Sequence, residues 1–115
     1  MKVIRLDEAV PYQASKHSGA HTMHLQHKNL GADAPFWVGC SYYLPGGKAE
    51  WDATPFHKVY VILEGEMTIA TEDGEVVLRP LDSVYLAPNE RREVRNDTNR
   101  VVTMLTVLTY PTEKD

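Results

Sequence analysis

Short apolar stretches separated by turn residues follow one another along the chain. Residues 57–65 are almost continuously apolar, as expected of a strand that is covered on both faces. Asp73-Gly74 lies between two such stretches and is a strong hairpin signal. Strands are predicted over residues 21–27, 36–44, 57–65, 66–71, 75–80, 82–88, 92–96 and 101–110. No stretch keeps a helical period over three turns, so the pattern predicts an all-β sandwich or barrel.

The length of 115 residues fits one domain, with residues 1–20 as an N-terminal arm and residues 111–115 as a loose tail. Hydrophobic residues make up 43% of the chain, an ordinary share for a globular protein. We therefore expect a single domain with its own core.

Charge and cysteine content narrow the functional classes. The net charge is −4, and the short basic run 90–95 interleaves acids with bases, so no nucleic-acid partner is expected. No apolar run approaches the roughly 20 residues of a membrane helix, and Arg5, Asp7 and Glu8 interrupt the start. The single cysteine, Cys40, excludes an internal disulfide. These features together favour a cytoplasmic protein that does not contact membranes.

Two segments resemble the motifs of the small single-domain cupins. Pro45-Gly46-Gly47 and Gly65 match the beginning and end of the first motif, and residues 87–96 match the second with Asn89 and Asn96. The resemblance covers about residues 20–110. It implies a cupin double-stranded β-helix, that is, a jelly-roll barrel, and also a homodimer, for which the aromatic stretch 36–44 suits an interface.

The positions that hold metal-binding histidines in such cupins differ here. Asp52, Thr54 and Lys58 stand at three of them and Arg92 at the fourth. A shift of one residue would place Glu93 at the fourth position, but Asn96 would then lose its match. Protonated lysine and arginine offer no lone pair to a metal, so neither a metal nor another cofactor is expected.

If the register of the resemblance holds, Lys58 and Tyr60 point into the barrel with Asp52, Thr54 and Arg92. Two cations and one anion would then attract a small anionic metabolite. We expect Asp52 and Lys58 to act as catalytic acid and base. Arg92, Thr54 and Tyr60 would bind the substrate.

Two more residues complete the predicted site. Trp51 would form a wall for the ligand, and His24 is a candidate acid or base. His24 belongs to a set with His17, His21 and His27 that lacks a defined metal-ligand spacing.

The leading hypothesis is a metal-independent isomerase, epimerase, dehydratase or decarboxylase acting on a small carboxylated metabolite. A non-catalytic sensor or carrier, and a structural barrel filled by an Asp52–Arg92 salt bridge, are the alternatives. A metal-dependent dioxygenase is disfavoured.

Overall fold

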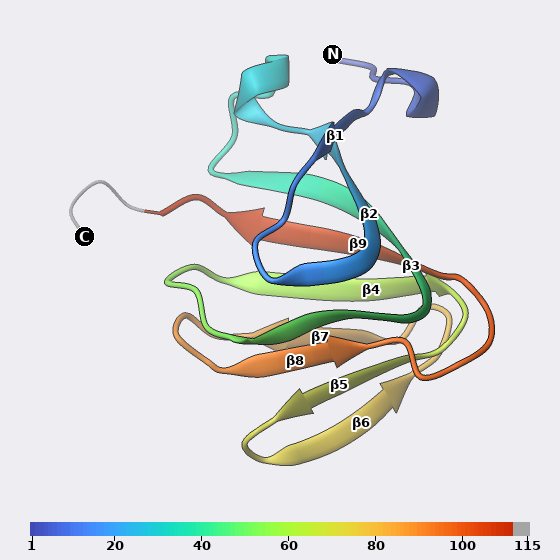
Figure 1. Ribbon diagram of the computed structural model, residues 1–115. Coiled ribbons are helices and arrows are strands. Elements are labelled where there is room, and N and C mark those ends of the chain that lie inside the picture. The colour runs from blue at the N-terminus through green and yellow to red at the C-terminus, as the bar shows by residue number, and fades with distance from the viewer. Residues whose placement is uncertain (112–115) are drawn as a thin grey trace.

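The computed structural model describes residues 1–111, in which strands dominate (Figure 1). Residues 112–115 of the predicted tail lie outside the described part. The strands are β1 (Val10–Tyr12), β2 (His17–Gln26), β3 (Phe36–Asp52), β4 (Lys58–Glu64), β5 (Met67–Thr71), β6 (Gly74–Leu78), β7 (Ser83–Leu86), β8 (Arg92–Arg95) and β9 (Val102–Thr109). Two short 3₁₀ helices, η1 (Leu6–Glu8) and η2 (Lys28–Leu30), complete the elements. The predicted all-β class is confirmed.

The long strand β3 belongs to both layers of the barrel. Its residues 36–43 pair with β9, and its later residues, from Lys48, pair with β8. The hydrogen-bonded order is β6-β5-β8-β3-β9-β4-β7, with β2 paired to β3 and β1 to β2. Because one strand passes from layer to layer, the sheet curls into a nearly closed barrel (Figure 1).

The prediction that the first half of β3 ends at residues 45–47 is wrong. The strand bends there and continues to Asp52. Gly46 adopts a left-handed φ of 79°, which favours glycine. Gly47 crosses so close to Gly19 of β2 that a Cβ on Gly19 would lie 2.9 Å from the Gly47 Cα. The two glycines thus turn the strand between layers without terminating it.

The residues assigned to the N-terminal arm contribute to the sheet. β1 pairs with β2 from Val10↔His24 to Tyr12↔Thr22, and β2 begins at His17, which pairs with Ala49. The alternation of residues 17–20 is too irregular to predict a strand, since Gly19 and a register shift interrupt it.

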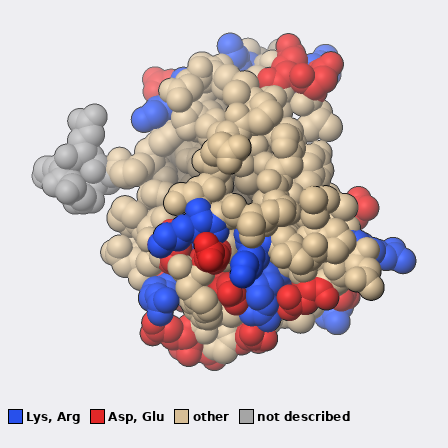
Figure 2. All heavy atoms as spheres, viewed as in Figure 1, with Lys and Arg blue, Asp and Glu red and all other residues tan. Residues whose placement is uncertain are grey.

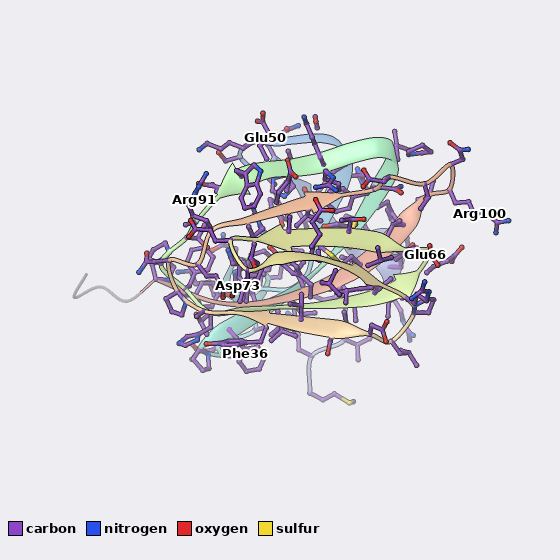
Figure 3. The ribbon with its side chains drawn as sticks, turned by 90° about the horizontal axis from the view of Figure 1, so that it is seen from below. Phe36, Glu50, Glu66, Asp73, Arg91 and Arg100 are labelled. Carbon is purple, nitrogen blue, oxygen red and sulfur yellow. The ribbon has the colours of Figure 1, made fainter. Side chains whose placement is uncertain are left out.

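The packed core lies inside the barrel. Its buried residues are Tyr43, Ala49, Tyr60, Ile62, Met67, Ile69, Leu78, Leu86, Val94, Val102 and Met104. Figure 3 shows Glu66 and Arg100 at one end of the strands and Arg91 at the other.

Acidic and basic side chains interleave on the face over β5, β6 and β8 (Figure 2). Arg95 is central to them, since its guanidinium lies 2.9 Å from Glu75, 2.7 Å from Glu93 and 3.1 Å from Asp97. Exposed ion pairs of this kind contribute little to stability. No helix within residues 1–111 is long and apolar enough to cross a bilayer.

Candidate functional site

A cavity of about 250 Å³ opens in the barrel, and the core residues Tyr43, Tyr60 and Met104 form part of its lining. β3, β4, β8 and β9 form its walls, and the segment between β1 and β2 covers one side. The lining residues are Tyr12, Gln13, Ala14, Ser15, His17, Trp37, Ser41, Tyr43, Asp52, Thr54, Phe56, Lys58, Tyr60, Arg92, Met104, Thr106 and Leu108. The cavity thus collects five of the seven predicted site residues: Asp52, Thr54, Lys58, Tyr60 and Arg92.

A bulge in β3 decides which side chains at its end face the cavity. Ala49 is buried, and the pairing with β8 shifts register between Ala49 and Asp52. Simple alternation from Ala49 would turn Trp51 inward, but the extra residue turns Asp52 inward instead. Glu50 and Arg91 lie on the outer surface at this end (Figure 3). The Arg91 guanidinium lies over the Trp51 ring, 5.4 Å from the ring centroid. Trp51 therefore lies outside the cavity that it was predicted to line.

Lys58 begins β4 and is buried, with 2% of its surface exposed. Its ammonium donates a hydrogen bond of 2.8 Å to the hydroxyl of Thr54. Burial, and next the nearby Arg92 charge, lower the pKa of Lys58 to about 8, although Asp52 and Glu90 act in the opposite direction. Lys58 is therefore a cation at neutral pH that can give up its proton.

Arg92 begins β8 directly opposite Asp52 and is also buried. Its Nε donates to the Tyr60 hydroxyl at 3.1 Å, and Nη1 donates to the Glu50 carbonyl at 2.9 Å. Within residues 1–111, the other terminal nitrogen has no hydrogen-bond partner. Arg92 is thus held rigidly by the protein while one edge of its guanidinium remains available to a ligand.

The carboxylate of Asp52 pairs with Lys16 at the rim, at a distance of 3.5 Å. A hydrogen bond from the Ala53 backbone, and then the Lys16 and Arg92 charges, hold the pKa of Asp52 below its usual value. No ion pair among the described residues joins Asp52 to Arg92 or Lys58. The salt bridge expected of a filled, purely structural barrel is therefore missing from this part of the chain.

His17 lines the cavity, although the sequence identifies it only as one of the N-terminal histidines and not as a site residue. Its Nδ1 donates to the Ser15 carbonyl at 2.7 Å, which leaves Nε2 as the free nitrogen of the neutral ring. Burial first, and the Arg92 charge in addition, lower the pKa of His17. His17 is therefore a neutral proton acceptor near pH 7. Its position depends on the irregular pairing of β2, which no sequence pattern reveals.

His24 lies behind the cavity wall. It stacks on Tyr12 at 4.2 Å and on His27 at 4.1 Å between ring centroids, and it meets the edge of Trp37 at 4.9 Å. Tyr12 and Trp37 line the cavity, whereas His24 is not among the lining residues described. The structure thus places His24 where it supports two wall residues, and its catalytic role stays a prediction.

Several of the other unpredicted lining residues follow strand parity. Trp37, Ser41 and Tyr43 lie on the inward face of β3, and Met104, Thr106 and Leu108 lie on the inward face of β9. Alternation within the strands predicted over residues 36–44 and 101–110 would have identified both faces.

The donor set does not suit a divalent metal. Asp52 is the single carboxylate of the four residues at the motif positions, the Thr54 hydroxyl already accepts from Lys58, and Lys58 and Arg92 are cations. Residues 1–111 contain no group of three or more His, Cys, Asp or Glu that could hold an ion.

Comparison with known proteins places this geometry in context. Residues 41–108 match the family model described as a cupin domain. A protein of Mycobacterium tuberculosis named beta-D-galactosidase is 41% identical over 111 residues, which are 96% of this chain and 96% of that protein.

Solved structures share the fold at low identity. A polyketide cyclase of Streptomyces resistomycificus superposes with a TM-score of 0.83 at 15% identity, covering 98% of this chain and 88% of its own. A predicted oxalate decarboxylase of Thermotoga maritima gives 0.80 at 20% identity, with 96% and 100% covered. A sugar phosphate isomerase of Silicibacter pomeroyi gives 0.79 at 19%, with 96% and 76% covered. These likenesses establish the jelly-roll architecture.

Proposed function

The chain belongs to the cupin family, and from this premise we propose that it is a metal-independent enzyme that moves protons on a small carboxylated metabolite. The observation that carries the proposal is the pair of buried cations, Lys58 and Arg92. Within residues 1–111, neither of them forms an ion pair with a carboxylate. A buried charge is stable only when it is paired, and an anionic ligand would supply the partner.

Each residue then has a defined role. The free edge of Arg92 binds the carboxylate of the substrate, because a guanidinium matches that group in geometry and charge. His17 Nε2, or the carboxylate of Asp52, takes a proton from the substrate. Lys58 returns a proton, since its ammonium form dominates below its pKa of about 8. The net change is an isomerisation, an epimerisation or an elimination without redox chemistry.

Deuterium exchange tests the proposal without knowledge of the product. Candidate acids are incubated with the protein in D₂O, and proton NMR follows the loss of carbon-bound protons and the formation of product. We expect Lys58→Met and Arg92→Met each to reduce the exchange at least a hundredfold, and at least one of His17→Gln and Asp52→Asn, the one that removes the proton acceptor, to do the same. Lys48→Ala, which removes an exposed lysine of β3, is the matched control and should retain it. Full exchange in all four site variants would show that the cavity is not catalytic.

A second candidate, hydrolysis of a β-galactoside, is favoured by the name of the relative that is 41% identical. Glycosidases usually employ two carboxyl groups. Asp52 is the one carboxylate among the described residues of the cavity wall, so the Lys58 ammonium would have to protonate the leaving group. Release of p-nitrophenol from p-nitrophenyl β-D-galactoside that is lost in Asp52→Asn and kept in Lys48→Ala would favour this candidate. The absence of release would set it aside.

A further inference from the structure

The cavity wall combines two kinds of chemistry. Lys58 and Arg92 supply positive charge, whereas Trp37, Ser41 and Thr106 supply an aromatic face and two hydroxyls. Across β4 and β9, Lys58 pairs with Leu108 and Tyr60 pairs with Thr106. Thr106 is therefore displaced from the level of Lys58 by two residues, or about 7 Å along the strand. A ligand that reaches both Lys58 and Thr106 needs about the length of a five- or six-carbon chain or ring.

Thr106 carries a hydroxyl that the protein does not satisfy. The residue is 7% exposed, and its Oγ1 has no hydrogen-bond partner in residues 1–111. A buried hydroxyl without a partner is costly, and a polar group of a ligand bound in the cavity would satisfy it.

Gly39 keeps this hydroxyl clear. It pairs with Thr106 across β3 and β9, and a Cβ at position 39 would lie 2.9 Å from Thr106 Oγ1 and 2.9 Å from Trp37 Cζ3. Any side chain there would press on both groups and on the Met23 carbonyl oxygen, 3.0 Å away. The glycine thus leaves room for the hydroxyl and the indole in their positions at the cavity wall.

Trp37 is fixed in place by the aromatic side chains behind it. Its ring meets Tyr12 at 5.8 Å and His24 at 4.9 Å in edge-on contacts. A rigid indole offers a flat apolar wall to the C–H groups of a ring, while neighbouring hydroxyls bind the ring's polar groups. The volume of about 250 Å³ has room for a single sugar ring.

We propose that the ligand is a sugar acid, with its carboxylate on Arg92 and Lys58 and a ring hydroxyl on Thr106. This inference rests on the proposed function, because it assigns a substrate class to the same site. It also connects the galactosidase name of the relative with the charge of this cavity, since a uronic acid is the carboxylated counterpart of a neutral sugar.

Calorimetric titration at pH 7 with three probes tests the inference. D-galacturonate carries both the carboxylate and the hydroxyls, D-galactose lacks the carboxylate, and cyclohexanecarboxylate lacks the hydroxyls. We expect galacturonate to bind at least tenfold more tightly than either other probe. Thr106→Val, which has nearly the same shape, should weaken galacturonate about tenfold and change cyclohexanecarboxylate less than twofold.

Two further variants serve as controls. Thr106→Ser keeps the hydroxyl and should retain the affinity for galacturonate. Thr103→Val lies on the opposite face of β9 and should leave all three affinities unchanged. Thermal melting of each variant establishes that it is folded.

The outcomes separate this inference from the proposed function. If cyclohexanecarboxylate binds as tightly as galacturonate, or if Thr106→Val changes neither, the sugar-acid inference is overturned and the proposed function stands. If galactose binds as tightly as galacturonate, or if neither acid binds, the cations do not recognise a carboxylate and both proposals are overturned.

Discussion

Burial and the Arg92 charge lower the pKa of Lys58 in the cavity, so its protonation should determine how the reaction rate changes at alkaline pH. Donation needs the ammonium form, which is present below the pKa of about 8. Acceptance by His17 needs the neutral ring, which is present above a pKa that burial holds below 6.5. We therefore expect kcat/KM for any acid that the enzyme converts to increase with increasing pH through a midpoint below pH 6.5. Above about pH 8, kcat/KM should decrease as the pH increases further.

The measurement is a series of initial rates from pH 5 to 10. His17→Gln should lower kcat/KM at every pH, because it removes the proton acceptor, and the residual rate should lack the acidic limb but keep the alkaline fall. A rate that continues to rise through pH 9 would show that the neutral amine of Lys58 is the active form.

The same residue should reduce the stability of the fold. The pKa of Lys58 falls from 10.5 in the unfolded chain to about 8 in the folded one. Between these values the unfolded state binds more protons, so the free energy of unfolding rises with pH in this window. Below pH 8 the full cost of the buried charge is present. We expect Lys58→Met to raise the free energy of unfolding by about 2 kcal/mol at pH 7.

Urea unfolding at pH 7 and pH 10 checks this expectation. The excess of the free energy of unfolding of Lys58→Met over that of the parent protein should be smaller at pH 10, where Lys58 of the folded parent is already neutral. Lys48→Met, on the exposed face, should show no such dependence. Equal stabilities of Lys58→Met and the parent at pH 7 would contradict a buried, uncompensated charge.

At the scale of elements, the bend in β3 depends on one close crossing of backbones. A Cβ on Gly47 would clash with the Gly19 carbonyl oxygen and lie 2.9 Å from the Leu44 carbonyl oxygen. Backbone atoms cannot rotate away, so Gly47→Ala should cost about 3 kcal/mol of stability. Gly46→Ala meets open space and should cost about 1 kcal/mol, from its left-handed φ alone. Urea unfolding of both variants gives the comparison, and equal losses would mean that the crossing is not tight.

The elements show what the sequence could and could not predict. Apolar runs and turn residues identify β4 to β9 because each strand has one strong local signal. The motif spacing also places Asp52, Thr54, Lys58 and Arg92 in one cavity. The bulge that turns Trp51 outward and the pairing that brings in His17 arise from contacts between distant strands. Local pattern carries no information about such contacts.

At the scale of the whole molecule, the homodimer stays a prediction with a direct test. Phe36 and Leu44, at the ends of the stretch proposed as the interface, are 45% and 55% exposed. Light scattering at micromolar concentration should give twice the chain mass of 13.0 kDa. Phe36→Glu should lower that mass, while Val76→Glu, at a similarly exposed site on β6, should not. A mass of one chain for the parent protein would contradict the prediction.

The extra residue near the end of β3 has a consequence for how such cavities change over time. Removing one residue there would exchange a carboxylate for an indole on the inner wall while every other amino acid stayed the same. The presence or absence of one residue near the end of β3, and not only the identity of the residues, thus determines which side chains face the cavity and which reaction such a barrel can host. Insertions and deletions beside this strand are therefore a short route between a charged reaction centre and a neutral, aromatic pocket.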